Sequence, residues 1–354
     1  MISLQSRFEG SLLGGACGDA LGYPVEHKSY SAIIAKYGEN GIQAMSIDES
    51  GEALITDDTQ MTIYTAQGLI HALKHNSSSD EMVVEVHKSY LRWIGSLLHN
   101  QPELTDLYRA LYSADELLHN DLLESGENRG LDKKMCRGGS TFTALLSGNR
   151  YSTSNPAPEG VRCGTIMRSA PIALCCYRNP ELAFSVGCEC AALTHGDPTA
   201  YLSAGVMCML ISHLLSGMEM REAIDHSLQY LGKQPNSTLL LHVLQKGVNL
   251  AQSPSLRPID DIKQIGKGWR ADENLSIVLY CCIRFDKNVK DALLACVNHD
   301  GDSDSVAAVC GNVMGAYVGR GGLPEEFVNH IQFKDLLVRQ ANELLRGSEI
   351  VGKS

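Results

Sequence analysis

One stretch near the amino terminus, Gly14-Gly15-Ala16-Cys17-Gly18-Asp19-Ala20-Leu21-Gly22, repeats small residues at the spacing of an α-helix. Leu12, Leu13 and Ala16 begin an apolar stripe that follows the same helical period. Two helices approach each other most closely where the facing side chains are small. The sequence therefore predicts a helix here that packs tightly against another helix.

The same helical periodicity runs through most of the 354-residue chain. Helical segments end where Gly or Pro follows, and no linker, low-complexity tract or repeat divides the chain. Strand-like alternation is limited to residues 43–47 and 53–55, which we expect to form a short pair. These patterns predict an all-α fold with one domain over residues 1–354. Further helices are expected at 61–73, 82–98, 104–118, 140–146, 166–177, 180–193, 199–215, 221–231, 239–251, 273–283, 289–297, 305–318 and 333–345.

The composition limits the partners of the chain. The net charge of −11 and the isoelectric point near 5.5 argue against a nucleic-acid-binding face. None of the 12 cysteines forms a CxxC pair, and several lie in apolar surroundings, which favours free thiols and a cytoplasmic location. We expect no signal peptide, because a basic region followed by a long apolar stretch is lacking at residues 1–9. No apolar run approaches the roughly 20 residues of a membrane span, so we expect no membrane partner.

Two acidic clusters lie near opposite ends of the chain, Thr56-Asp57-Asp58-Thr59 and Asp300-Gly301-Asp302-Ser303-Asp304-Ser305. Each precedes an apolar helix, so each could simply cap that helix. Carboxylates this close together also repel one another unless a cation binds them. Hard divalent cations such as Mg²⁺ take oxygen ligands from Asp, Ser and Thr. If the fold brings the two clusters together, they supply enough oxygens for a site with two Mg²⁺ ions.

Two further segments have the features of an anion site. Gly138-Gly139-Ser140-Thr141 and Cys163-Gly164-Thr165 each precede a helical segment, where backbone N–H groups are free to bind phosphate. Ordinary capping by Ser140 or Thr165 is the alternative. His195 joins two helical stretches, where it either neutralises a helix end or contacts a ligand.

In order along the chain, these segments resemble the ADP-ribosylglycohydrolase family. The resemblance covers residues 10 to about 315 and rests mainly on the paired TDDT and GDxDS signatures with an intervening MRxxP. The matching strings are Gly10-Ser11-Leu12-Leu13-Gly14, Gly18-Asp19-Ala20-Leu21-Gly22, Glu26, Thr56-Asp57-Asp58-Thr59, Gly164-Thr165-Ile166-Met167-Arg168-Ser169-Ala170-Pro171, Thr194-His195, Pro198 and Gly301-Asp302-Ser303-Asp304-Ser305.

The resemblance implies a compact orthogonal helical bundle with two Mg²⁺ ions, or Mn²⁺, at the mouth of an ADP-ribose cleft. It assigns the catalytic roles to Glu26, the mobile glutamate of the family, and to Asp58. The implied metal ligands are Thr56, Asp57, Asp58, Asp302, Asp304 and Ser305. The implied substrate-binding residues are Gly139, Ser140, Cys163, Gly164, Thr165, Met167 and His195.

Two positions depart from the family pattern. Ser305 stands where many members have Thr, and its hydroxyl oxygen can still coordinate a cation. Cys163 stands where some members have Asn, which changes the contacts near the phosphates.

The implied activity is Mg²⁺-dependent hydrolysis of the N-glycosidic bond between ADP-ribose and a protein arginine, by attack of water on the ribose anomeric carbon. Alternatives are an O-linked ADP-ribose on serine, a small ADP-ribose metabolite, or an immunity protein that binds and counteracts an ADP-ribosylating toxin. Residues 125–136 and 149–164 are irregular loops where the substrate would be chosen, and neither carries a decisive signature.

Overall fold

The computed structural model describes residues 2–98, 139–158 and 160–351. Within these ranges the secondary structure consists of helices without a strand, in agreement with the predicted all-α class. The predicted helix at 104–118 and the loop at 125–136 lie outside the described residues. The α-helices are α1 (Leu4–Gly22), α2 (Tyr30–Tyr37), α3 (Asp57–Lys74), α4 (Ser79–Leu98), α8 (Gly139–Leu145), α9 (Ala170–Cys175), α10 (Pro180–Ala192), α11 (Pro198–Leu215), α12 (Met220–Leu231), α13 (Thr238–Gln252), α14 (Pro258–Ile265), α15 (Ala271–Phe285), α16 (Val289–Val297), α17 (Ser303–Val318), α18 (Glu325–Val328) and α19 (Lys334–Val351). The 3₁₀ helices are η1 (Tyr23–Val25), η2 (Cys163–Thr165) and η3 (Arg320–Gly322).

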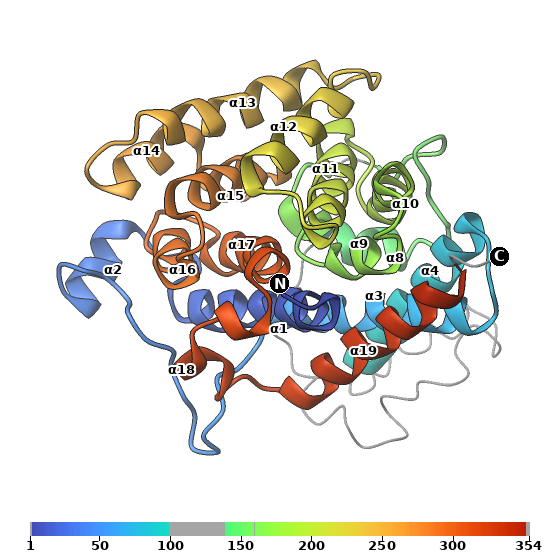
Figure 1. Cartoon of the computed structure of the whole chain (residues 1–354), viewed down its shortest axis with the longest axis horizontal. Coiled ribbons are helices and arrows are strands. Elements are labelled where there is room, and N and C mark those ends of the chain that lie inside the picture. Colours follow the sequence, from blue (N-terminus) through green and yellow to red (C-terminus); the bar gives the residue numbers. More distant parts are fainter. Residues whose placement is uncertain (1, 99–138, 159, 352–354) are drawn as a thin grey trace.

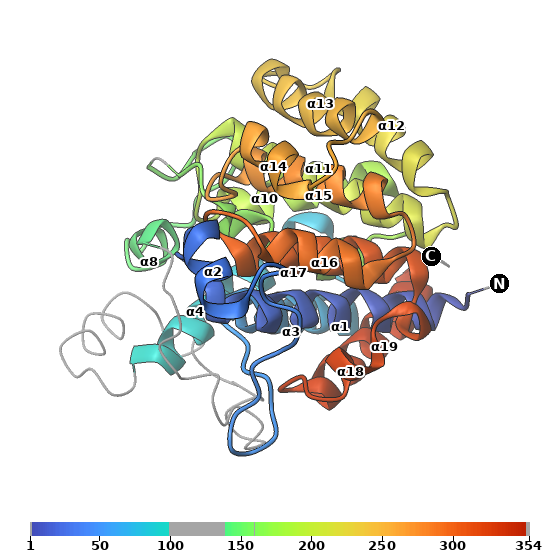
Figure 2. The same cartoon turned by 90° about the vertical axis from the view of Figure 1, so that its left-hand side faces the viewer.

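Helix α1 lies in the middle of the molecule, and the other helices form layers on both sides of it. Figures 1 and 2 both show α12 and α13 at one edge, α11 and α15 beneath them, and then α17. Helices α1 and α3 come next, and α19 lies at the opposite edge. Burial on all sides explains why α1 is rich in small and apolar residues rather than amphipathic.

Helices α1 and α17 pack antiparallel with their backbones in contact. A methyl group added to Gly14 would lie 2.2 Å from the carbonyl oxygen of Gly311, and one added to Gly18 would lie 1.9 Å from that of Ala307. At the end of the contact, the same addition to Gly22 would lie 2.4 Å from Cα of Asp304. The small-residue stretch is therefore an interhelical seam, and its last contact positions the second acidic cluster.

The predicted strand pair at 43–47 and 53–55 is wrong. Residues 43–47 belong to no strand, and Ala53 forms an isolated parallel bridge with Ile331. The amide of Ala53 donates to the carbonyl of His330 at 2.7 Å. Residue 53 thus pairs through its backbone with a segment far along the chain rather than with residues 43–47.

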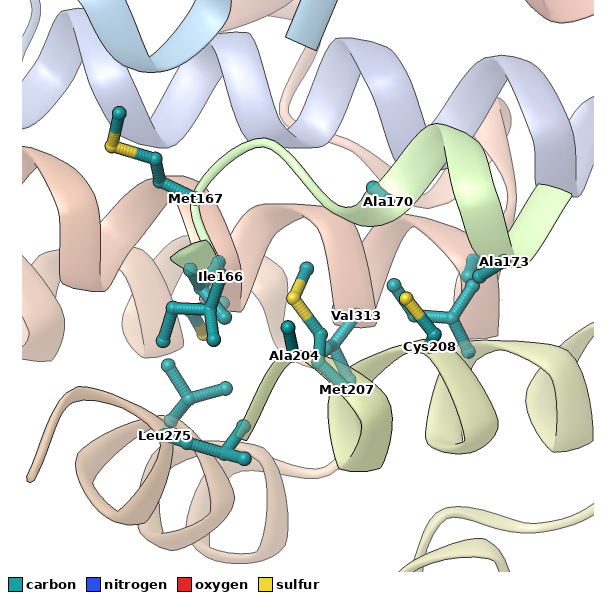
Figure 3. Packing of buried hydrophobic residues seen from close by; sticks show 14 of the residues in the cluster. Ile166, Met167, Ala170, Ala173, Ala204, Met207, Cys208, Leu275 and Val313 are labelled. Carbon is teal, nitrogen blue, oxygen red and sulfur yellow. The ribbon is translucent and has the colours of Figure 1, made fainter. Parts of the chain in front are cut away.

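The segment after η2 connects the central core with a cavity lined by most of the predicted site residues. Figure 3 shows Ile166 and Met167, which are neighbours in the chain, pointing to opposite sides. Ile166 lies among core side chains that include Ala204 and Leu275, and it is fully buried. In this segment Ile166 packs into the core, and the next residue, Met167, lines the cavity.

Two findings concern the expected absence of a membrane span and the expected free thiols. Helix α11 is long and apolar enough to cross a membrane, but 83% of it is buried within the protein, as in the core helix of a globular fold. Every cysteine in the described ranges is buried and unpaired.

The seam predicts a large effect from one methyl group. Gly18→Ala should lower the free energy of unfolding by about 3 kcal/mol, because the new atom meets backbone, which cannot rotate away. Gly232→Ala is the matched control, since its added methyl has only ordinary contacts at 3.6 Å or more. Chemical denaturation followed by circular dichroism measures both variants. Equal stability of the two would contradict the seam.

Candidate active site

One cavity of about 460 Å³ brings together residues from distant parts of the chain. Its walls come from the loop after η1, the start of α3, the start of α8, the segment around η2, the turn between α10 and α11, the segment before α15, and the start of α17. The lining residues are Glu26, His27, Asp57, Asp58, Gly139, Ser140, Thr141, Arg162, Cys163, Gly164, Met167, His195, Trp269, Asp302, Asp304 and Ser305. The two acidic clusters therefore meet, as the sequence predicted.

The first cluster forms the start of α3 and is held in place by Asp19 of α1. The carboxylate of Asp19 is fully buried and accepts hydrogen bonds from the amides of Thr56, at 3.0 Å, and Thr59, at 3.1 Å. Thr56 is the cap residue of α3, and its hydroxyl accepts from the amide of Asp58. Asp19 thus fixes the first turn of α3, so that Asp57 and Asp58 face the cavity.

The second cluster forms the start of α17. The amide of Asp302 donates to the carbonyl of Lys267 at 2.9 Å, and the Cys163 thiol contacts Oδ2 of Asp302 at 2.7 Å. Asp302 is the cap position of α17, but its side chain makes no capping hydrogen bond. Asp300 points elsewhere and accepts from the amide of Tyr30, at the start of α2. The acidic side chains of α17 are therefore left for the cavity.

The carboxylates of the two clusters are buried close together. Glu26, Asp302 and Asp304 each place an oxygen within 4.8 Å of the others. Burial is the largest cause that raises the pKa of Asp302 to about 6 and the pKa of Asp58 and Asp304 well above the usual range, with neighbouring carboxylates adding to the effect for Asp58 and Asp304. Mutual repulsion in a dry site is costly for the folded chain.

Two buried oxygens show what the group lacks. Oδ2 of Asp58 and Oδ1 of Asp304 have no hydrogen-bond donor. Buried carboxylate oxygens normally have a donor or a cation as partner. A set made only of carboxylate and hydroxyl oxygens is suited to a hard divalent cation. The residues present therefore fit a metal site.

The opposite wall is built around His195. A methyl group added to Gly164 would lie 3.2 Å from Cε1 of the His195 ring, so the ring lies close to this glycine and a side chain here would crowd it. Arg168 donates from Nη2 to the Thr194 hydroxyl at 2.6 Å, and that hydroxyl lies 2.8 Å from Nδ1 of His195. These contacts hold the His195 ring in place, and Nε2 on its other side would lie 3.4 Å from a methyl group added to Gly164.

His195 is buried at this wall as a neutral imidazole. Burial, followed by the charges of Arg168 and Arg162, lowers the pKa of His195 to about 3. The imidazole is consequently uncharged near neutral pH. The expectation that His195 merely neutralises a helix end does not fit an uncharged ring that lines the cavity.

Two predicted site residues do not line the cavity. The side chain of Thr56 is fully buried and caps α3. The Thr165 hydroxyl is also fully buried and donates to the carbonyl of Ala200, on the core side. Either residue can reach a ligand in the cavity only through its backbone or after the side chain turns.

The sequence reasoning missed four lining residues: His27, Thr141, Arg162 and Trp269. Arg162 directly precedes the predicted Cys163-Gly164-Thr165 segment, and Thr141 directly follows Ser140. Trp269 was harder to identify from the sequence. It is one of only two tryptophans, and it follows Gly266 and Gly268 and precedes a predicted helix. Asp19 was also missed as a support, although a single acid in a run of small, buried residues is a visible anomaly.

The profile of the ADP-ribosylglycohydrolase family matches residues 1–352. The chain belongs to the ADP-ribosylglycohydrolase family. Proteins of this family are metal-dependent glycohydrolases that act on ADP-ribose, in agreement with the acidic group described above.

Individual relatives are distant but cover most of the chain. An ADP-ribosylarginine hydrolase Tri1 of Serratia proteamaculans (strain 568) is 22% identical, over 96% of this chain and 78% of the relative. An ADP-ribosylhydrolase ARH3 of Xenopus tropicalis is 21% identical, over 92% of this chain and 90% of the relative. A solved structure, described as an ADP-ribosylglycohydrolase-related protein complex, has a TM-score of 0.65 at 23% identity and covers 98% of this chain and 99% of its own. This structural likeness supports the family's fold.

The buried acids predict that the stability of the folded chain depends on pH and that a bound cation removes this dependence. In the folded chain the pKa of Asp19 and Asp302 is raised to about 6 by burial, against about 3.9 for an unfolded Asp. Raised acid pKa values stabilise the fold below about pH 4, and this contribution is lost as the pH rises through about 6. In excess chelator, the melting temperature should therefore fall from about pH 5 to about pH 7, and Mg²⁺ added at pH 7 should restore it.

Asp302→Asn is the control for this experiment, because it removes one of the titrating groups while keeping the side-chain shape. The variant should show a flatter pH dependence in chelator. Equal melting temperatures of the chelated parent protein at the two pH values would contradict the repulsive acidic group.

Proposed function

We propose that this chain is a Mg²⁺-dependent hydrolase that removes ADP-ribose from modified protein side chains, with arginine as the linked residue. The observation that carries the proposal is one cavity with buried carboxylates at one wall and with Arg162, Ser140 and the neutral His195 at the other. ADP-ribose has a matching polarity, with ribose hydroxyls at one end of an anionic pyrophosphate. The overall charge of −11 offers that anion little attraction, so local groups must bind it.

Those local groups lie around η2 and α8. Gly164 and His195 both line this wall, and the lack of a side chain at Gly164 leaves room beside the His195 ring. Arg162 and Ser140 line the same wall. A second cavity of about 590 Å³ also includes Ser140 and Arg162 in its lining, so a long ligand can extend beyond the first cavity. We assign the pyrophosphate to this wall.

At the acidic wall we assign Asp57, Asp58, Asp302, Asp304 and Ser305 as ligands of two Mg²⁺ ions, with Thr56 as a further candidate. Bound there, the ions would supply positive charge that orients the ribose hydroxyls and lowers the pKa of water. Mn²⁺ satisfies the same set of oxygen ligands.

The chain's own carboxylates would carry out the proton transfers. Cleavage of a glycosidic bond develops positive charge at the anomeric carbon, which nearby carboxylates stabilise. We assign Glu26 and Asp58 as the groups that move protons between the water and the leaving side chain. Glu26 suits this role because its side chain lies at the edge of the acidic group, only 9% exposed but on a loop.

Arginine is preferred as the linked residue for two reasons. The ADP-ribosylarginine hydrolase relative matches over nearly the whole chain. A guanidinium leaving group would also meet a cavity mouth that carries Glu26 and the acidic clusters. Serine-linked ADP-ribose is the alternative that the assay must separate.

Removal of single metal-site carboxylates should abolish turnover without unfolding the chain. Asp57→Asn and Asp304→Asn each keep the side-chain shape and reduce repulsion among buried acids. We expect at least a hundredfold loss of turnover with unchanged helical circular dichroism. Asp300→Asn is the matched control, since Asp300 belongs to the same run but accepts from Tyr30 and lies outside the cavity lining. Wild-type turnover in Asp304→Asn would remove the proposed mechanism.

The linkage is decided by release of ADP-ribose from proteins modified on arginine or on serine, with Mg²⁺ and with chelator. We expect Mg²⁺-dependent release from arginine and competitive inhibition by free ADP-ribose. Release from serine alone would replace the arginine assignment. Tight ADP-ribose binding without release from either substrate would favour a binding protein, such as a toxin antagonist.

A further inference from the structure

An aromatic pair lies at the mouth of the cavity, beside Glu26. The rings of His27 and Trp269 stack at a centroid distance of 4.6 Å and an interplanar angle of 17°. His27 also holds Glu26, with 3.0 Å between Nε2 of the imidazole and Oε1 of the carboxylate. The three side chains thus form a chain of contacts from Trp269 through His27 to the edge of the acidic group.

Trp269 belongs to the fixed frame of the cavity. Its carbonyl accepts from the amide of Cys163 at 3.1 Å, and the amide of Ala271 donates to the carbonyl of Val161 at 2.9 Å. Two residues before Trp269, the carbonyl of Lys267 accepts from the amide of Asp302 at 2.9 Å. The backbone that carries Trp269 is therefore bonded both to the wall around η2 and to the start of α17.

His27, in contrast, is on the loop after η1, and its side chain is 63% exposed. Its backbone lies in the left-handed region, with φ of 61°. Few residues other than glycine adopt this conformation without cost, although His, Asn and Asp tolerate it best. The amide of His27 donates to the carbonyl of Gly301, at 3.3 Å. The backbone of His27 is thus tied to Gly301 by one long hydrogen bond, and the ring is held by its stack on Trp269 and its contact with Glu26.

We propose that Trp269 and His27 form a latch that positions Glu26 over the acidic group. The inference rests on the proposed function for the role of Glu26, but the stack itself is a property of the free protein. Trp269 acts as a positioning residue through His27, and neither ring needs to touch the substrate. Stacking between flat rings restricts a loop side chain without consuming the imidazole N–H that binds Glu26.

Because Trp269 acts only through His27, the latch predicts that loss of both rings costs no more activity than loss of His27 alone. His27→Asn and Trp269→Leu should each lower kcat by about twofold to tenfold, the equilibrium effect of one aromatic pair, with KM changed less than twofold. The double variant should be no slower than the slower single variant, because one interaction can be lost only once. Trp269→Phe keeps a stacking ring and should retain at least about half of the parent kcat.

Asn is chosen at position 27 because it tolerates the left-handed backbone, so the variant tests the ring rather than the fold. Metal content and melting temperature of all variants should stay near those of the parent. If the effects of His27→Asn and Trp269→Leu multiply, or if KM rises more than kcat falls, the rings contact the substrate independently and the latch is wrong.

Fluorescence provides a readout that needs no activity. The chain has two tryptophans, and Trp93 is fully buried, so subtracting the spectrum of Trp269→Phe isolates the emission of Trp269. His27→Asn should shift this emission to longer wavelength and increase its quenching by acrylamide at least about twofold, because the ring loses its cover. An unchanged spectrum overturns the stack. If His27→Asn shows the spectral change but the parent protein hydrolyses no ADP-ribosylated substrate, the proposed function is refuted and the stack remains.

Discussion

The close contact between α1 and α17 is the constraint on which the rest of the structure depends. Along this seam Gly14 meets Gly311, and Gly22 meets Asp304, with backbone against backbone. Direct backbone contact allows little sliding, since any shift would bring side chains into collision. The seam therefore sets the start of α17, which carries the second acidic cluster, relative to the end of α1, which leads to Glu26. The geometry of the site is fixed by a contact that involves few of its own side chains.

Asp19 extends the influence of α1 to the first acidic cluster. By accepting from the amides of Thr56 and Thr59, it ties the start of α3 to the same helix that positions α17. The result is a set of buried carboxylates whose pKa values burial raises, which is costly for the free chain. A bound divalent cation would offset that cost. The burial of neighbouring carboxylates therefore both destabilises the site without a cation and favours cation binding. The opposite wall, by contrast, carries the neutral ring of His195 and the guanidinium of Arg162.

Much of the helical architecture was predictable, because helix periodicity depends on local spacing. The small-residue stretch correctly indicated close helix packing, and the boundaries of α3, α11 and α17 fell within a few residues of those expected. The strand prediction at residues 53–55 failed because the backbone of Ala53 pairs with Ile331 in a single bridge and not with a neighbouring strand. Short alternating segments carry no information about a partner far away in the chain.

The sequence by itself determined the helical class, the family motifs and the two acidic clusters, since each is a local pattern of residue types. Only the tertiary structure decided which side chains share the cavity. It brought Trp269 against His27 and turned the hydroxyls of Thr56 and Thr165 away from the ligand space. These outcomes depend on contacts between segments up to hundreds of residues apart, and nearer in the chain on the hydrogen bonds that amides at the start of α3 donate to the Asp19 carboxylate. The direction of a side chain is set by such neighbours, and residue order alone does not specify them.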